Sequence, residues 1–121
     1  MKTKINPLIL ASELKGMLGS PDLILIDAGA GAPAREAYTK KHIEGALYID
    51  LNEDLSDIKE DAAEGGRHPL PSAEDFGQTI SKFGITPESH VIIYDDKGGA
   101  IAAARVWWMM CAMGPGKVQV L

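Results

Sequence analysis

Cysteine is almost absent from this chain of 121 residues, since Cys111 is the only one. A single cysteine can form no disulfide within the chain, which is typical of a protein in a reducing cytoplasm, and we expect that location. Basic residues are also scarce: 12 lysines and arginines stand against 17 acids, for a formal net charge of −5. This balance disfavours general binding to nucleic acid, whose phosphates attract basic surfaces.

Long apolar runs are missing as well. No segment approaches the roughly 20 apolar residues that span a bilayer, and the most apolar stretch, 101–113, is shorter and contains Arg105. The first ten residues, MKTKINPLIL, lack the long apolar core and the cleavage site of a signal peptide. No spacing of Cys, His, Asp and Glu suggests a metal site. We therefore expect no membrane contact, metal or cofactor.

What the chain does contain is an alternation of strand-like and helical segments. Runs rich in Ile, Val and Leu predict five strands, at 8–10, 23–26, 47–49, 91–94 and 118–121. Apolar periodicity and capping residues predict helices after Ser12, over 34–42, from the N-cap Ser72 to Gly84, and over 101–113. The alternation predicts an α/β fold with a parallel sheet covered on both faces. The length suits one domain, residues 1–121.

The loop Asp-Asp-Lys-Gly-Gly-Ala at 95–100 is the strongest candidate for a site, because it joins the strand 91–94 to the helix 101–113. The first N–H groups of a helix have no partners within the helix and can hold an anion. Ligands of open α/β sheets also collect at the carboxyl ends of the strands. We therefore place the candidate site at this loop.

Two other loops invite a functional interpretation. The sequence GAGAP at 29–33 misses the spacing of nucleotide-binding glycine loops, and no Walker lysine follows it. We expect it to be a flexible loop beside the site. The acidic connection 50–71 is long for an ordinary loop and is typical of a lid or of a surface against a partner domain.

Two motifs resemble those of the rhodanese sulfurtransferases. The stretch VIIYDDKGGAIAAARVWWMM resembles their strand–loop–helix, in which a catalytic domain carries its persulfide on a cysteine directly after the strand; here that residue is Asp95. The second motif is an aromatic residue followed by H-I-P-G-A. It resembles Tyr38 followed by the run from His42 to Ala46, with Glu44 in place of the proline. The chain is thus similar to the non-catalytic N-terminal half of two-domain thiosulfate and 3-mercaptopyruvate sulfurtransferases.

The resemblance implies a three-layer α/β/α rhodanese-like fold with a five-stranded parallel sheet in the order 3-2-4-5-1. It also implies that the chain stops inside the fifth strand, so that we expect an incomplete folding unit. A catalytic second rhodanese domain of the same polypeptide would follow, and the whole enzyme would move sulfane sulfur from thiosulfate or 3-mercaptopyruvate to a thiol or cyanide. This chain alone is predicted to be inactive. The alternative is a stand-alone regulatory module that binds an anion or a partner with the cysteine-less loop.

Asp95 is expected to accept the loop N–H groups as a structural occupant of the vacated position. The alternatives are a general base or an ion-pair partner between domains. Arg67 and Lys97 could add positive potential for a small anionic sulfur donor at the domain interface. Arg105 either extends to solvent, pairs with a loop acid or contacts the second domain, and Asp96 is a further candidate contact.

Four other residues complete the expectations. His68 resembles a histidine implicated in proton handling in mercaptopyruvate-type enzymes, although Asn52 stands where an acid would accompany it; the alternative is a solvated loop histidine. Cys111 lies within the apolar helix and is expected to behave as a small buried hydrophobe. Trp107 and Trp108 point about 100° apart, so at most one faces the sheet and the other is a candidate domain contact. His42 is expected to cap the helix that precedes it.

Overall fold

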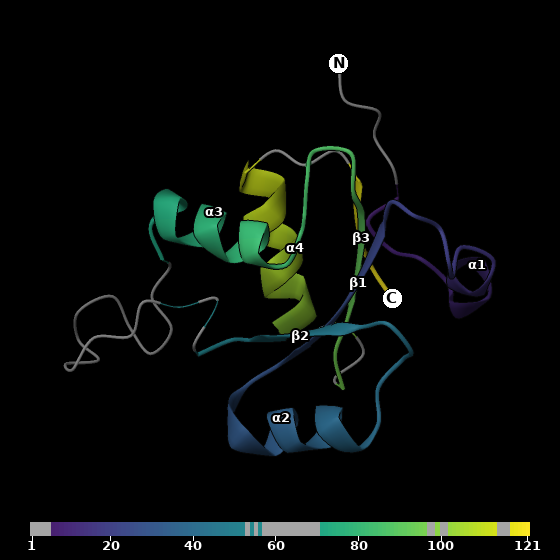
Figure 1. Ribbon diagram of the computed structural model, residues 1–121, viewed down its shortest axis with the longest axis horizontal. Helices are drawn as coiled ribbons and strands as arrows, with labels where there is room; N and C mark the ends of the chain where they lie inside the picture. The colour runs from purple at the N-terminus through teal and green to yellow at the C-terminus, as the bar shows by residue number, and fades with distance from the viewer. Residues whose placement is uncertain are drawn as a thin grey trace.

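A computed structural model of the protein describes residues 6–52, 54, 56, 71–96, 99, 102–113 and 117–121. It contains four strands and four helices within these residues (Figure 1). In chain order they are α1 (Ala11–Lys15), β1 (Leu23–Gly29), α2 (Gly31–Lys40), β2 (Leu47–Asp50), α3 (Ala73–Lys82), β3 (His90–Tyr94), α4 (Ala102–Met113) and β4 (Lys117–Val120). No helix of the described residues is long and apolar enough to cross a membrane.

The strands form a parallel sheet in the order β2-β1-β3-β4. This arrangement confirms the predicted order for the four strands present. The prediction of a fifth strand is wrong for the described residues, because the segment at Leu8 makes only an isolated bridge to Val120. Pro7 carries no N–H to extend the pairing, and Leu10 is already the N-cap of α1. The chain therefore leaves the sheet edge after one bridge.

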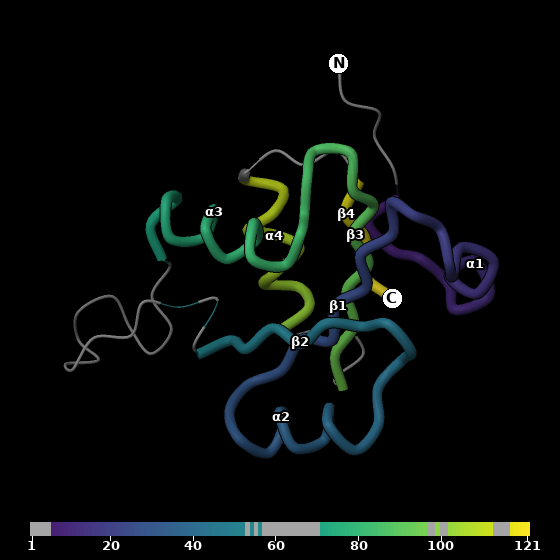
Figure 2. The backbone as a smooth tube through the Cα atoms, viewed as in Figure 1, coloured from purple at the N-terminus to yellow at the C-terminus, as the bar shows by residue number. Residues whose placement is uncertain are grey.

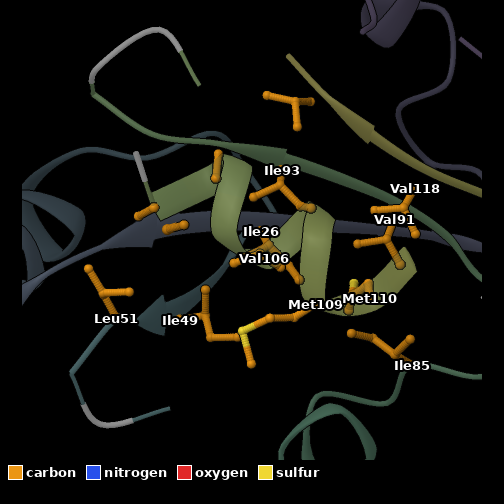
Figure 3. Packing of buried hydrophobic residues seen from close by; sticks show 14 of the residues in the cluster. Ile26, Ile49, Leu51, Ile85, Val91, Ile93, Val106, Met109, Met110 and Val118 are labelled. Carbon is orange, nitrogen blue, oxygen red and sulfur yellow. The ribbon is translucent and has the colours of Figure 1, made fainter. Parts of the chain in front are cut away.

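Helices α3 and α4 cover one face of the sheet, and α1 lies on the other (Figures 1 and 2). Alternate side chains of each strand point to the α3–α4 face, where they pack on the buried stripe of α4 (Figure 3). Ile26, Ile93, Val106 and Met110 are completely buried there. Each such side chain contributes on the order of 1.5–3 kcal/mol when it leaves water, so this face holds most of the core.

The opposite face carries a smaller core. Leu25 of β1 and Ile92 of β3 point to it and pack with Ile9, Leu14 and Ala46. Helix α1 has only five residues and contributes one of these side chains, Leu14. The sheet is therefore covered much more thickly by α3 and α4 than by α1.

The helix starts follow the local sequence signals only in part. Ser72 caps α3 as predicted, since its Oγ accepts a hydrogen bond from the backbone N–H of Asp75 at 3.1 Å. Ser12 does not cap α1, because the helix begins at Ala11 with Leu10 as its N-cap. The stretch 29–33, expected to be a loop, divides between the end of β1 and the first turn of α2. The physical reason is a contact with β2, because the N–H of Gly31 donates a hydrogen bond to the carboxylate of Asp50.

Candidate functional site

A cavity of about 300 Å³ opens at the carboxyl end of the sheet, between the ends of β1 and β3. Small side chains form most of its wall, and Asp95 and Asp96 supply its charge. Its lining residues are Ala28, Gly29, Ala30, Pro33, Ala34, Asp95, Asp96 and Ala102. The candidate loop and the GAGAP stretch, which lie far apart in the sequence, therefore meet at one cavity.

The carboxylate of Asp95 joins the loop to the first turn of α4. Its Oδ1 accepts a hydrogen bond from the N–H of Gly99 at 2.7 Å, and its Oδ2 accepts one from the N–H of Ala103 at 2.9 Å. Gly99 has a φ of +84°, and a Cβ at this position would lie 2.5 Å from the Cγ1 of Val120. Only glycine fits there without displacing the side chain of Val120. The expected hydrogen bonds from loop N–H groups to Asp95 are present.

Asp50, the last residue of β2, accepts several hydrogen bonds at the same carboxyl end of the sheet. It is almost fully buried, and its Oδ2 accepts hydrogen bonds from the N–H of Gly31 at 3.1 Å and from the hydroxyl of Tyr48 at 2.8 Å. Its Oδ1 accepts from the N–H of Asn52 at 2.8 Å. Burial and the contact with Asp50 raise the pKa of Tyr48. A carboxylate is thus held at the N-terminus of α2, which favours negative charge and explains why the helix begins at Gly31.

Sequence reasoning did not identify Asp50 as a site residue. The available signal was its position directly after the predicted strand 47–49, and hence at the carboxyl end of that strand, just as Asp27 and Asp95 follow the predicted strands 23–26 and 91–94. The sequence could not reveal that Gly31, 19 residues earlier, supplies the N–H group that the carboxylate accepts.

Tyr94, the last residue of β3, contacts both β1 and the turn before β2. Its hydroxyl accepts a hydrogen bond from the N–H of Ile43 at 3.0 Å and donates one to the carboxylate of Asp27. Burial raises the pKa of Tyr94 to about 12, with a further contribution from the charge of Asp27. Burial also raises the pKa of Asp27, while the hydrogen bond from Tyr94 acts in the opposite direction. This pair fixes the turn before β2 to the ends of β1 and β3.

The predicted site residues come together only in part. Asp95 and Asp96 line the cavity, and Asp96 is exposed. Arg105 lies one helical turn beyond Ala102, where its Nη2 is 3.5 Å from the Oγ of Ser56, and burial lowers the pKa of its guanidinium. Arg67, His68 and Lys97 lie outside the described residues.

The prediction that Cys111 is buried is wrong, because its thiol is exposed. The buried face of α4 is formed by Ala102, Ala103, Val106, Met109 and Met110. Cys111 follows Met110 by 100° around the helix, which carries it away from the sheet. An apolar composition all around a helix hides this difference between its faces.

The two tryptophans divide as expected. Trp107 is half-buried, and its Nε1–H donates a hydrogen bond to the carbonyl of Val118 at 3.2 Å. Trp108 is 53% exposed and lines a shallow apolar groove between α3 and α4. His42 takes the predicted capping position, with its Nδ1 2.6 Å from the carbonyl oxygen of Tyr38 and its ring stacked on that tyrosine.

The arrangement offers anchored carboxylates but no sulfur nucleophile in the residues that line the cavity. The N–H groups of Gly99 and Ala103, which could hold an anion, already donate to Asp95. Among the described residues no group of three or more His, Cys, Asp and Glu could hold a metal ion.

The family model of the rhodanese-like domain matches residues 10–121, nearly the whole chain. The chain belongs to the rhodanese-like domain family. It is 38% identical over 122 residues to thiosulfate/3-mercaptopyruvate sulfurtransferase 2 of Arabidopsis thaliana, covering 96% of this chain and 34% of that protein. It is 35% identical over 118 residues to the 3-mercaptopyruvate sulfurtransferase of Mus musculus, covering 93% of this chain and 38% of the mouse protein.

The rhodanese-like fold is also supported by solved structures. The chain superposes on the 3-mercaptopyruvate sulfurtransferase from Leishmania major with a TM-score of 0.81 and 26% sequence identity, over 93% of this chain and 31% of that one. In eight curated relatives that it matches, this rhodanese-like chain spans between 30% and 43% of the relative's length. It therefore corresponds to one part of proteins more than twice as long.

Proposed function

We propose that this rhodanese-like chain is the non-catalytic N-terminal domain of a two-domain sulfurtransferase. The observation that carries the proposal is the environment of Asp95. The residue directly after β3 is a carboxylate, and it accepts the N–H groups of Gly99 and Ala103. In a catalytic rhodanese domain this position would belong to the cysteine that carries sulfane sulfur.

A carboxylate cannot replace that cysteine chemically. Transfer of sulfane sulfur proceeds by attack of sulfur on sulfur, which requires a thiolate. The oxygens of Asp95 are fixed acceptors and form no persulfide. Cys111, the chain's one thiol, is exposed on α4 and does not line the cavity. The persulfide cysteine of the proposed enzyme therefore lies in a second rhodanese domain of the same polypeptide.

The proposed contribution of this chain is structural and interdomain. Its relatives are more than twice as long and are named as thiosulfate or 3-mercaptopyruvate sulfurtransferases, which supports both the second domain and the class of donor. The exposed ring of Trp108 is a candidate contact, because buried aromatic anchors are common at interfaces. Arg105 would contact the second domain beside its active site, and Arg67 and Lys97 would add positive potential that attracts a donor anion between the domains. His68 would take part in proton handling there. The single cysteine of this chain can form no disulfide within the chain, which supports a cytoplasmic location.

The alternative, a stand-alone module that binds an anion in the loop, is less well supported. Two of the N–H groups that would bind the anion donate to Asp95 instead. Asp95 and Asp96 also place negative charge at the cavity, which repels an anion. If the chain is a stand-alone module, these charges therefore favour a protein partner over an anion as its ligand.

The deciding experiment uses the polypeptide encoded by the whole reading frame that contains this chain. We expect turnover of thiosulfate with cyanide, or of 3-mercaptopyruvate with a thiol acceptor, and we expect Cys111→Ser to retain it. Replacing the cysteine after the matching strand of the second domain should abolish turnover. A reading frame without a second rhodanese domain would refute the proposal in favour of the stand-alone module.

A further inference from the structure

Helix α2 concentrates basic residues on an acidic chain. The helix and its C-cap contain three of them, Arg35, Lys40 and Lys41, against one acid, Glu36, whereas the whole chain has a formal net charge of −5. All three basic residues are exposed, and no residue of α2 is buried. The outer face of α2 is therefore a positively charged surface.

This surface lies beside the cavity at the carboxyl end of the sheet. Ala34 of α2 lines the cavity together with Asp95, and Arg35 directly follows Ala34 in the chain. The far end of α2 is also near the end of β1, because the pKa of Asp27, which burial raises, responds to the charge of His42 as well. Figure 1 shows α2 at the end of the sheet where β1 and β3 finish.

Contacts with the fold hold part of this charge in place. The guanidinium carbon of Arg35 lies 5.0 Å from the ring centre of Tyr48, which is a cation–π distance. Tyr48 is fixed in turn, since its hydroxyl donates to the carboxylate at the end of β2. The charge of Lys40 is partly balanced, because its Nζ lies 3.4 Å from Oε1 of Glu36. Arg35 is therefore a cation that the fold positions, and Lys41 extends the positive surface beyond Lys40.

Negative charge at the same end of the sheet makes these cations important for an anionic ligand. Asp95 and Asp96 line the cavity. Thiosulfate is a dianion and 3-mercaptopyruvate a monoanion, so these carboxylates repel both donors. Cations beside the cavity offset this repulsion and raise the local concentration of anions. Such an effect can change association rates by roughly 10- to 1,000-fold, and salt suppresses it.

We propose that α2 attracts the anionic sulfur donor to this end of the sheet, with Arg35 and Lys41 as steering cations. The inference rests on the proposed sulfurtransferase function for the identity of the donor. The two side chains act through the potential around the cavity and touch no reacting atom. The proposal therefore predicts attraction for anionic reagents in general and none for neutral ones.

The first test measures this attraction without turnover. Asp95→Cys in the Cys111→Ser background places one thiol beside the cavity. Its rate constants are measured with dithiobis(nitrobenzoate), a dianionic disulfide, and with dithiodipyridine, a neutral one. Their ratio cancels changes in the pKa or exposure of the thiol. At an ionic strength of about 0.02 M, adding Arg35→Gln and Lys41→Gln should lower the ratio of the anionic to the neutral rate about three- to tenfold.

Lys15→Gln with Lys117→Gln is the matched control, because it removes the same charge from exposed residues of α1 and of the first position of β4. It should change the ratio less than about twofold, and salt of about 0.5 M should abolish the effect of the α2 substitutions. Lys41→Gln alone keeps the contact of Arg35 with Tyr48 and should lower the ratio in the same direction if the double variant fails to fold. An unchanged ratio, or an equal loss in the control, would overturn the proposal.

The second test uses the polypeptide encoded by the whole reading frame. Arg35→Gln with Lys41→Gln should raise KM for thiosulfate about threefold or more at low ionic strength and leave kcat unchanged. The effect on the monoanion 3-mercaptopyruvate should be smaller. Normal turnover with an unchanged KM would overturn steering of the donor. A lowered ratio in the first test with no turnover here would refute the proposed function and still establish that α2 attracts anions.

Discussion

The Oδ2 of Asp95 lies 2.9 Å from the backbone nitrogen of Ala103, so the side chain that ends β3 closes the first turn of α4. The residue at this position of a catalytic rhodanese domain would instead present a thiolate to the loop. The contact therefore attaches the residue that follows β3 to the start of α4.

The chain alone should have no sulfurtransferase activity, because no thiol lines the cavity and Asp95 cannot carry sulfane sulfur. The measurement is thiocyanate formation from thiosulfate and cyanide, compared with a reaction without protein. Cys111→Ser is the control for chemistry at the exposed thiol. Turnover well above the blank that disappears in Cys111→Ser would contradict the prediction.

Asp95→Cys should create a reactive thiol with weak turnover. The N–H groups of Gly99 and Ala103 would stabilise a thiolate in place of the carboxylate. The pKa of this thiol, obtained from the pH dependence of its alkylation rate, should lie below the reference value of about 8.5 for a free cysteine. The variant is combined with Cys111→Ser so that only the thiol at position 95 is measured. A thiol pKa at or above the reference would show that the N–H groups do not favour an anion.

Asp50→Asn should destabilise the fold by about 1.5–3 kcal/mol, the typical value of a hydrogen bond to a charged group. The amide nitrogen would face donors where Oδ2 now accepts from Gly31 and Tyr48. Urea unfolding followed by circular dichroism measures the change. Asp22→Asn, an exposed acid in the turn before β1, is the matched control. Equal stability of the two variants would mean that the Asp50 contacts contribute little.

Tyr94 should titrate near its raised pKa of about 12, because burial and the charge of Asp27 disfavour the phenolate. Its pKa in the unfolded chain is lower, about 10, so the stability that it contributes is complete below about pH 10 and decreases as the pH rises toward 12. Absorbance of the phenolate on titration with base measures this directly. Tyr94→Phe should remove the component near 12, and its persistence in the variant would assign it to another tyrosine.

Several features of the fold followed from the sequence by itself. Unbroken runs of Ile, Val and Leu fixed the places of β1 and β3, because strands buried on both faces need continuous apolar side chains. Ser72 marked the start of α3, and Gly84, with a φ of +77°, marked the turn that follows it. These are local signals, in which a residue's own conformational preferences or hydrogen-bonding groups act within a few positions of the chain.

Other features depended on contacts between distant segments. Asp50 accepts the N–H of Gly31 and so starts α2 inside a stretch that looked like a loop. The direction in which α4 packs on the sheet exposes Cys111, although the helix is apolar on all sides. Local sequence cannot determine which face of such a helix is buried, or which donor meets a strand-end carboxylate, because both depend on how the sheet brings separate segments together. The sequence predicted that Asp95 accepts backbone N–H groups at this loop, whereas only the tertiary structure identified the donors as Gly99 and Ala103, because the fold of the loop decides which N–H groups reach the carboxylate.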